Sequence, residues 1–358
     1  MGYKKIYVFA PVVILLLVMC WYRHQSTQNS MSYTDNMTEF PGKIVDESFR
    51  KLLNLYQKKL EALQKSNLWS TIPETPTCKK DMNPSSQCVD PECPQDLPER
   101  PVVRLQNVLS SMRPEDMTTL KRMSQLEELQ VQPTGKRILF VTGASSNHFM
   151  ESQAMLKNFH EIIPAHFSNY SLRYYDLGLK PTERAQANIK AADIVVWLDS
   201  SIRLPKEGIG KSVQDVLLQG LTIGGVGGRA PQFIDTRMMN YFNSTPCMYS
   251  PFTMIEANFM MFHNDEFVRD AIIAPWATCA VNHNCMCPDN SVLYCNHAIN
   301  KYGKCHRYDQ AAMNMIALQL FGKHVETLRP KNLQYEVKRG DTFPYFNHLD
   351  SQFKTKGA

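Results

Sequence analysis

The side chains most able to do chemistry in this sequence follow a strongly apolar run at residues 193–198. Asp199 and Ser201 come directly after that run. Two acids spaced as Asp-x-Asp after a strand can hold Mg²⁺ or Mn²⁺ against a diphosphate, because these hard cations prefer carboxylate oxygens. Ser201 stands in the place of the second acid, so the spacing predicts a weakened cation site. The alternative is an aspartate that only caps the end of the strand.

Three further groups could act as acids, bases or ligands. Glu256 lies within 253–259, a predicted strand of mostly apolar residues, and a carboxylate buried there would need a function or a partner. Asp309 precedes an apolar helix predicted over 311–321. It is either the N-cap of that helix or an acid that the loop holds for a substrate. His348 is a candidate late metal ligand, with an exposed histidine as the alternative.

Two segments resemble phosphate-binding loops but lack residues that such loops need. Residues 142–146 open like a dinucleotide-binding loop, but Asn147 and Phe149 occupy the positions where that loop requires glycine. Residues 210–212 mimic the end of a P-loop, whose opening glycine would fall at Pro205. The sequence therefore disfavours a dehydrogenase and a P-loop enzyme. The glycine-rich residues 224–228 predict a flexible turn, with a loop that covers a donor as the alternative.

Alternating strands and helices are expected to position the chemical groups. The predicted elements are a strand at 137–142, a helix through 149–159, a strand at 172–176, a helix at 183–190 and a strand at 193–198. Strand–helix alternation indicates a parallel sheet with helices on both faces, and ligands then bind beyond the carboxyl ends of the strands. Residues 142–146, Asp176 and 199–201 lie at those ends. We therefore expect them to meet at one rim of the sheet.

The N-terminal residues predict a membrane anchor. Residues 6–22 carry no charge, and their length is near the lower limit for crossing a hydrocarbon core of ~30 Å. Trp21 and Tyr22 suit a membrane interface, and no small-residue cleavage site follows them, which favours an uncleaved anchor over a cleaved signal peptide. We expect residues 1–5 in the cytoplasm and everything after Arg23 in a lumen. The sequons at Asn36, Asn169 and Asn243 predict glycosylation there.

Cysteines cluster in the C-terminal third of the chain. The candidates for disulfide bonds are Cys247, Cys279, Cys285, Cys287, Cys295 and Cys305. Clustered cysteines behind an anchor are typical of an oxidising compartment. The rival interpretation is a zinc site on Cys285, Cys287, His297 and His306, but the C-x₂-C pairs of structural zinc sites are missing. The sequence favours disulfides.

Residues 23–100 predict a stem between the anchor and the sheet. Residues 44–66 carry apolar side chains at helical spacing, which indicates a spacer or a homodimerising helix. Residues 70–100 are rich in proline and cysteine and predict nothing longer than a turn. Helices are predicted over 101–112 and from residue 114, so the main domain would span 101–350, followed by a tail at 351–358.

Composition excludes several classes of protein. Apolar residues make up 43% of the chain and charged residues 20%, as in ordinary globular proteins, so the chain is not globally disordered or a coiled-coil rod. The net charge is +5, from 39 basic and 34 acidic residues spread along the sequence. Such a mild and dispersed excess predicts no nucleic-acid partner.

Four segments together resemble one protein family over about residues 100–350. They are residues 138–178, the WLDSSIR segment, the run from APWATCA to CMCP, and CHRYDQAAMN. These segments resemble the largely nematode family catalogued as domain of unknown function 1647. The order of elements is more distantly similar to that of GT-A glycosyltransferases. The resemblance implies a GT-A-like α/β domain with a mostly parallel central sheet flanked by helices, preceded by the transmembrane anchor and the helical stem.

The resemblance also implies an activity, namely transfer of a sugar from a nucleotide-sugar donor to a glycan or glycoprotein in the Golgi or ER lumen. Asp199, Ser201 and His348 would hold Mn²⁺ or Mg²⁺, and Glu256 or Asp309 would act as the base. The implied donor-binding residues are Thr142, Ala144, Ser145, Asn147, Asp176 and Arg203. Because Ser201 departs from the family pattern, the alternative is a non-catalytic, membrane-tethered binding domain with a degenerate metal site, in the lumen or at the cell surface.

Overall fold

The computed structural model describes most of the predicted main domain and one helix of the predicted stem. The described residues are 47–66, 68–70, 100–124, 138–176, 194–292, 295, 302–331 and 333–345. The predicted anchor at 6–22, the tail at 351–358, Asn36, His297 and His348 lie outside these ranges. Within them, no helix combines the length and the apolar character that a membrane crossing requires.

A mixed five-stranded sheet forms the centre of the molecule, with the strand order β2-β1-β3-β6-β5. The strands are β1 (Ile138–Ala144), β2 (Tyr170–Asp176), β3 (Ile194–Leu198), β5 (Leu221–Arg229) and β6 (Thr253–His263). Strands β2, β1 and β3 are parallel, and β6 is antiparallel to both of its neighbours. The predicted α/β class with a central sheet is therefore confirmed, but the sheet is mixed, because both pairings of β6 are antiparallel.

The central strands form because their residues are apolar on both faces. Every residue of β3 is buried, as are Ile138–Val141 in β1, and such continuous apolar runs are typical of strands covered on both sides. Alternate residues belong to two separate hydrophobic clusters. Val141 and Trp197 pack into one cluster, whereas Phe140 and Val196 pack into the other. The sheet thus separates two cores.

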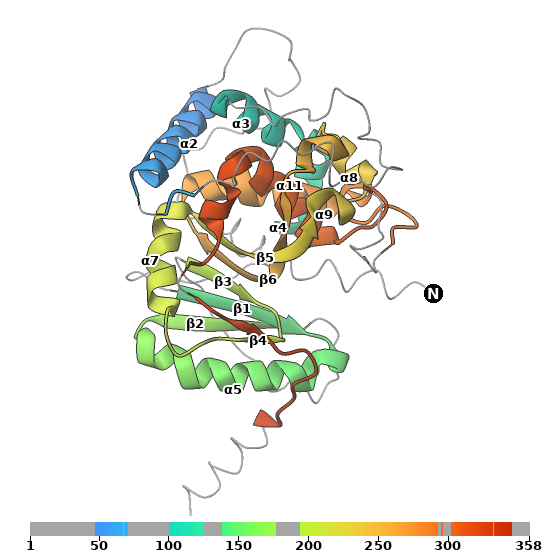
Figure 1. The fold of residues 1–358 in the computed structure, drawn as a ribbon. Coiled ribbons are helices and arrows are strands. Elements are labelled where there is room, and N and C mark those ends of the chain that lie inside the picture. The colour runs from blue at the N-terminus through green and yellow to red at the C-terminus, as the bar shows by residue number, and fades with distance from the viewer. Residues whose placement is uncertain are drawn as a thin grey trace, which may run out of the picture.

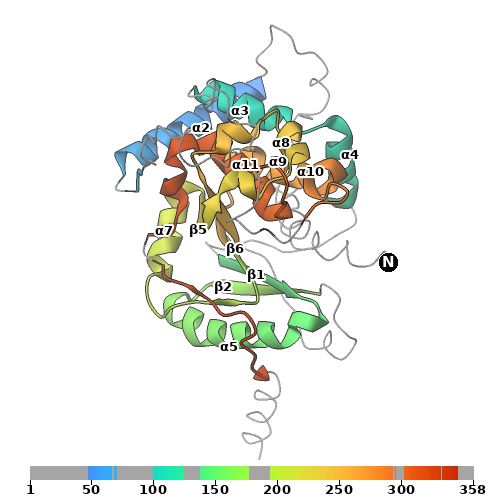
Figure 2. The same cartoon turned by 45° about the vertical axis from the view of Figure 1, so that its right-hand side comes forward.

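Helices cover each face of the sheet (Figure 1). One face carries α5 (Phe149–His166) and the buried side chains of α7 (Ile209–Gln219). The other carries α3 (Pro101–Ser110), α9 (Ala274–Val281) and α11 (Tyr308–Phe321). Figure 2 shows α5 apart from this second group, across the sheet. Three further helices, α4 (Pro114–Ser124), α8 (Thr236–Tyr241) and α10 (His283–Met286), lie near α9.

The helix predicted as part of the stem packs against this domain. It is α2 (Glu47–Lys65), and its buried residues are Leu52, Tyr56 and Leu63. The Tyr56 ring stacks on Phe267 with 5.2 Å between ring centroids, and its hydroxyl donates a hydrogen bond to the carbonyl of Leu320. The apolar stripe that could have formed a homodimer seam is therefore covered by the chain's own core, which corrects the proposed dimerising role of this helix.

The glycine-rich residues 224–228 belong to strand β5, so the predicted flexible turn is wrong. The strand follows α7, which ends at Gly220 with a φ of +83°. A Cβ on Gly220 would lie 2.8 Å from Val268 Cγ2 and 2.9 Å from Lys59 Nζ. Glycine is therefore needed there both for the left-handed backbone and for the close packing of α7 against α2 and the residues after β6.

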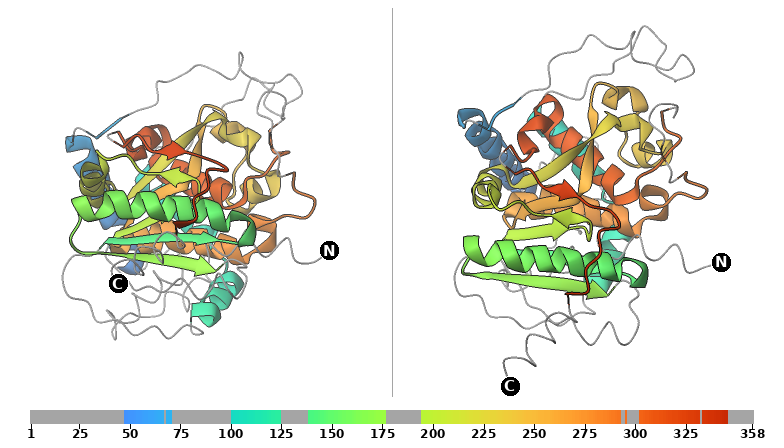
Figure 3. Two further views of the ribbon diagram at one scale, coloured as in Figure 1. Left: turned by 90° about the horizontal axis from the view of Figure 1, so that it is seen from below. Right: turned by 60° about the horizontal axis from the view of Figure 1, so that its bottom comes forward.

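A segment near the C-terminus returns to the α5 side of the sheet (Figure 3). Its short strand β7 (Glu336–Val337) pairs antiparallel with β4 (Ile202–Arg203), which follows β3. Further along, the Tyr345 hydroxyl lies 2.9 Å from Nδ1 of His160 on α5. The segment thus connects the turn after β3 to α5.

Candidate functional site

Asp199 lies at the carboxyl end of β3, where the sequence predicted it. Its backbone N–H donates to the carbonyl of Asn258 at 2.8 Å, which fixes the end of β3 against β6. Its Oδ1 atom accepts hydrogen bonds from the N–H and the hydroxyl of Ser201, at 2.9 and 2.6 Å. Ser201 is fully buried, whereas Asp199 is partly exposed. Asp199 therefore orders the turn after β3 through its Oδ1 atom.

A buried carboxylate that the sequence analysis missed supports this turn. Glu151 on α5 accepts a hydrogen bond from the Ser200 hydroxyl at 2.8 Å and another from the Gly340 N–H at 2.7 Å. The side chain of Glu151 joins α5, the turn after β3 and the C-terminal segment. Its only sequence signal is an acid among the apolar residues of a predicted helix.

Asp309 lies in the first turn of α11, and Arg307 rather than Asp309 precedes that helix as its N-cap. The carbonyl of Asp309 accepts a hydrogen bond from Trp276 Nε1 at 3.1 Å, and the neighbouring Gln310 side chain donates to the Ile255 carbonyl on β6 at 2.5 Å. The pKa of the Asp309 carboxyl is raised to about 6, chiefly by burial; backbone hydrogen bonds oppose the shift, and the negative charge of Asp199 adds a smaller upward contribution. Asp199 and Asp309 are therefore close enough to interact electrostatically, although 110 positions separate them in the sequence.

Glu256 on β6 is held at both of its carboxylate oxygens. Asn258 Nδ2 donates to Oε1 at 2.7 Å, and the Tyr335 hydroxyl donates to Oε2 at 2.9 Å. Burial and the adjacent Glu256 charge raise the pKa of Tyr335, so this hydroxyl remains a hydrogen-bond donor. Two donors fix the carboxylate in one orientation, as a group that must act on a ligand requires.

These contacts connect the three predicted acids at one end of the sheet. Asn258 links Asp199, through its carbonyl, to Glu256, through its side chain. Gln310 places the first turn of α11, and with it Asp309, next to the residue before Glu256. Sequence reasoning missed Asn258 and Tyr335, because only the pairing of β3 with β6 and the return of the C-terminal segment bring them to the site.

The predicted donor-binding residues fall into two groups. Ser145 and Asn147 lie at the connection from β1 to α5, reach solvent, and are joined by a hydrogen bond between their side chains. Thr142 and Ala144 are buried within β1, and Thr142 Oγ1 has no hydrogen-bond partner among the described residues. Asp176 ends β2 in register with Ala144, so its backbone lies at the predicted rim.

Arg203 does not lie free at this rim. Its guanidinium donates to the carboxylate of Asp341 at 3.0 Å from Nε and to the Asp341 carbonyl at 3.0 Å from Nη2. Its Nη1 atom donates to the carbonyls of Ser200 and Ile202, both at 2.9 Å. Arg203 is buried and holds the C-terminal segment against the turn after β3. The structure therefore corrects its predicted role as a donor-binding residue.

The described residues do not fit a resident divalent cation. No group of three His, Cys, Asp or Glu side chains in the described ranges could hold a metal ion. The Ser201 hydroxyl, which the sequence pattern places at the second ligand position, donates to Asp199 and so turns its proton toward the only acid of the motif. Mg²⁺ and Mn²⁺ require several oxygen ligands, so Asp199 alone is an insufficient site.

Disulfide bonds shape the loop that leads into α11. Cys279 is bonded to Cys285 and Cys295 to Cys305, and Cys247 is also in a disulfide. Cys287 was predicted to form a disulfide bond, but in the structure it is a buried thiol near Tyr308. Its neighbour Cys285 is already bonded to Cys279, six positions earlier.

His306 is unsuited to the alternative zinc site. Its Nδ1 atom accepts a hydrogen bond from the Asp235 N–H at 3.3 Å, and its Nε2 atom lies 3.1 Å from the Met286 carbonyl. Both ring nitrogens thus face backbone groups of the protein. Burial lowers the pKa of His306 to about 4, so the ring is neutral and joins the loop before α11 to α8 and α10.

Two glycines of β5 allow side chains to lie directly over the strand near Glu256. A Cβ on Gly224 would overlap the Tyr335 hydroxyl, and a Cβ on Gly225 would overlap the guanidinium of Arg329. That guanidinium donates to the Thr253 hydroxyl at 2.7 Å and pairs with Glu326 at 2.8 Å. The lack of side chains at these two positions of β5 therefore allows Tyr335 and Arg329 to pack directly on the strand.

Replacing Gly225 with alanine should destabilise the protein by about 1–3 kcal/mol, because the new methyl group displaces Arg329 from Thr253 and Glu326. Urea denaturation measures the change in the free energy of unfolding. Gly227→Ala is the matched control in the same strand, because no atom lies within 4 Å of a Cβ at that position. Equal effects of the two substitutions would contradict the close approach at Gly225.

Fold and site together define an α/β domain with acidic groups at one end of a mixed sheet. The sequence matches no family model and no curated protein. Two solved glycosyltransferases are similar to the structure. The bifunctional glycosyltransferase WbbM, in its apo form, has a TM-score of 0.32 at 14% identity, over 56% of this chain and 44% of that one. The chain thus covers less than half the length of WbbM.

The second similar structure is the galactosyltransferase LgtC in complex with donor and acceptor sugar analogues. It has a TM-score of 0.31 at 11% identity, over 50% of this chain and 70% of that one. Both TM-scores are low, so we base no argument about activity on either likeness.

Proposed function

We propose that this chain is a glycosyltransferase-like enzyme that transfers a sugar from a nucleotide-sugar donor to a glycan or glycoprotein acceptor. The observation that carries the proposal is the gathering of Asp199, Glu256 and Asp309 at one end of the sheet, linked through Asn258 and Gln310. Interacting carboxylates with a perturbed pKa are typical of sites that move protons.

Each acid has a role that its surroundings support. Asp309, with a pKa of about 6, is ionised at neutral pH yet basic enough to remove the proton of an acceptor hydroxyl. Asp199 accepts hydrogen bonds from sugar hydroxyls through the oxygen that Ser201 does not occupy. Glu256, fixed by Asn258 and Tyr335, orients the sugar or the acceptor. A base on the acceptor corresponds to transfer with inversion at the sugar carbon.

The diphosphate of the donor would lie at the connection from β1 to α5. The N-terminus of a helix carries unpaired N–H groups and a partial positive charge, which suit a phosphate. Ser145 and Asn147 add exposed polar groups at this connection. Because the described donor set does not fit a divalent cation, we assign no step to Mn²⁺ or Mg²⁺.

The proposal includes the finer predictions from the sequence. The chain would be a single-pass type II membrane protein with its enzymatic domain in the Golgi or ER lumen, and a member of the domain of unknown function 1647 family. The apolar residues 6–22 and the disulfides support a lumenal address. Asn169 and Asn243 are exposed, as glycosylation requires.

A second candidate is a non-catalytic lumenal or cell-surface binding domain. The replacement of the second motif acid by Ser201 favours it, because the Ser201 side chain is buried and bonded within the turn. A domain of this kind would keep the sheet and bind a glycan without using a nucleotide-sugar. Binding of nucleotide-sugars therefore separates the two candidates.

Replacing Asp199 with asparagine should lower the affinity for a nucleotide-sugar about tenfold and leave the affinity for the bare nucleoside diphosphate unchanged. Asparagine still accepts the Ser201 hydrogen bonds, but it removes the charged acceptor for the sugar hydroxyls. Isothermal titration of the full chain with UDP- and GDP-sugars, and with UDP and GDP, measures both affinities. Glu207→Gln, at an exposed acid before α7, is the matched control.

Two outcomes would count against this proposal, and a third would change only its treatment of the cation. If the wild-type chain binds no nucleotide-sugar, the binding-domain candidate is favoured. If Asp199→Asn binds nucleotide-sugars like the wild type but melts several degrees lower, Asp199 is only a cap for the turn. If Mn²⁺ tightens binding strongly, residues outside the described ranges complete a cation site.

A further inference from the structure

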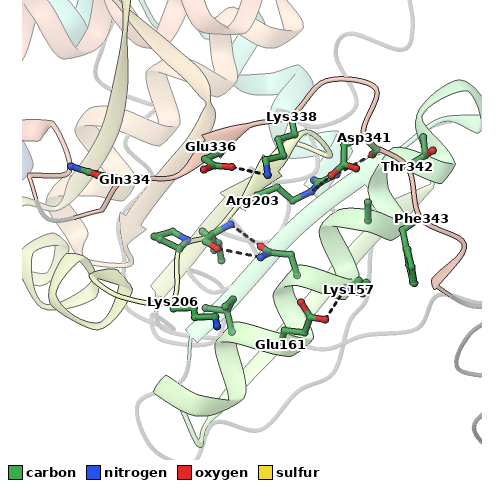
Figure 4. Close-up of a pocket in the computed structure, with 15 residues that line it drawn as sticks. Lys157, Glu161, Arg203, Lys206, Gln334, Glu336, Lys338, Asp341, Thr342 and Phe343 are labelled. Atoms are coloured by element: carbon green, nitrogen blue, oxygen red, sulfur yellow. Dashed lines mark hydrogen bonds and ion pairs between the residues drawn. The ribbon is translucent and has the colours of Figure 1, made fainter.

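We propose that a polar groove between α5 and the β4–β7 ribbon binds an uncharged oligosaccharide, at a site separate from the acids at the end of β3. The groove has a volume of about 430 Å³, within the range of small-molecule sites. Its walls come from α5, from residues 203–206 after β4, and from the C-terminal segment at 334–343. Figure 4 shows the lining side chains of all three segments.

Six of the seven charged side chains that line the groove are paired within it, and Lys206 is the exception. Lys157 pairs with Glu161 at 2.8 Å, Arg203 with Asp341 at 3.0 Å, and Lys338 with Glu336 at 2.9 Å. At three of the four cations, a phosphate or nucleotide would have to compete with a carboxylate and would face its repulsion, and only Lys206 is left to pair with it. An apolar ligand would strip water from the charges without replacing its hydrogen bonds.

A neutral sugar suits paired charges, because each hydroxyl both donates and accepts. One hydroxyl can donate to a carboxylate while its neighbour accepts from the adjacent ammonium group, so an ion pair is solvated without being broken. Leu204, Pro205 and Ile162 supply apolar surface for the C–H faces of a sugar ring. Phe343 adds an aromatic ring at the edge, with Lys157 Nζ 5.0 Å from the ring centroid.

The walls of the groove are fixed before a ligand arrives. The Asn158 side chain donates to the Leu204 carbonyl at 3.2 Å and accepts from the Leu204 N–H at 2.7 Å, which attaches residues 203–206 to α5. Arg203 attaches the same residues to the Asp341 loop through both Nε and Nη2. A preformed site loses less conformational entropy when it binds a ligand.

The groove lies on the α5 side of the turn after β3, and Arg203, which lines it, donates to the Ser200 carbonyl in that turn. α5 packs on one face, whereas α11, which carries Asp309, packs on the other. None of Asp199, Glu256 and Asp309 lines the groove, so a saccharide bound there would not occupy the positions of the three acids. The inference does not depend on catalysis and holds equally for a binding domain.

The test uses the full chain and three neutral probes, lactose, N,N′-diacetylchitobiose and mannobiose, with saturation-transfer NMR to detect binding and titration to measure affinity. At least one probe should bind, and Glu161→Gln should weaken that binding about tenfold through loss of a charged acceptor. Glu266→Gln is the matched control, because Glu266 also pairs with a lysine, Lys51, at 2.8 Å but does not line the groove. It should leave the affinity unchanged.

The proposal is overturned if none of the probes binds, or if Glu161→Gln and Glu266→Gln bind alike. It is also overturned if UDP-sugars displace the probe, because the saccharide would then occupy the site at the end of β3. Failure of nucleotide-sugar binding with retained, Glu161-dependent probe binding would refute the transferase proposal alone.

Discussion

Replacing Asp309 with asparagine should reduce kcat for sugar transfer at least about a hundredfold while the chain stays folded. The substitution keeps the shape and the neighbours of the side chain but removes the base that takes the acceptor proton, and positioned bases contribute roughly 10²–10⁴-fold to rates. Release of nucleoside diphosphate from UDP- and GDP-sugars in the presence of acceptor glycans measures the effect. An Asp309→Asn variant with the wild-type kcat would exclude this residue as the base.

The pH dependence of the wild-type enzyme provides an independent test of the same residue. Because the carboxylate form of Asp309 is the base, kcat should fall as the pH drops below about 6, the pKa of the folded state. Asp309→Asn should lack this titration. A wild-type kcat that stays constant down to pH values well below 6 would contradict the assignment.

The contribution of Asp309 to the free energy of unfolding should change with pH in the direction opposite to that of most acidic residues. The pKa of this carboxyl is raised from 3.8 to about 6 on folding, so the protonated form is favoured in the native state. The resulting stabilisation is fully present below pH ~4 and is lost as the pH rises to about 6, by an amount on the order of 2–3 kcal/mol. Urea denaturation across this range should show the loss in the wild type and not in Asp309→Asn. Identical profiles for the two proteins would refute the burial of this charge.

The parts of the fold that the sequence could predict depend on local pattern. The runs at 138–141 and 194–198 are apolar without interruption. Because both runs are short and are bounded by turn signals, they indicate strands that are covered on both faces. Helix α4 begins at Pro114 with acids in its first turn, as expected from its dipole. Local chemistry decides these elements, so their existence and type follow from the residues alone.

The remaining parts depend on contacts between distant segments. Residues 224–228 have the composition of a turn, but β6 pairs with β5, and the side chains of Tyr335 and Arg329 cover the bare glycine backbone. The direction of β6 is equally non-local, because an apolar run does not reveal which neighbour it pairs with. Nothing in a single sequence marks these tertiary effects.

The same distinction applies to the candidate site. Asp199 could be found from its position after an apolar strand, and Asp309 from its position before an apolar helix. Tyr335 could not, because it lies in an irregular segment and acquires its role only by reaching Glu256, 79 positions earlier. Arg203 was misassigned for the converse reason, since its position beside Asp199 in sequence says nothing of the Asp341 loop that engages its guanidinium.

Replacing Tyr56 with alanine should destabilise the domain by about 3–5 kcal/mol, the usual range for removing a large buried aromatic side chain. Tyr56 is fully buried, stacks on Phe267, and reaches the last turn of α11 through its hydroxyl. Its loss leaves a cavity between α2 and the core, so α2 would detach more easily. Urea denaturation of the full chain, monitored by tryptophan fluorescence, measures the free energy of unfolding.

Two control variants separate packing from other effects of the Tyr56 substitution. Tyr56→Phe keeps the ring and removes only the hydrogen bond to the Leu320 carbonyl, so it should cost about 1 kcal/mol. Lys58→Ala lies on the exposed side of α2 and should change stability by no more than about 0.5 kcal/mol. If Tyr56→Ala instead dissociates a dimer and leaves the domain as stable as before, α2 acts between chains rather than within one. Loss of stability at constant oligomeric state would make α2 an integral helix of the domain, because only burial within the same chain couples Tyr56 to the unfolding of the sheet.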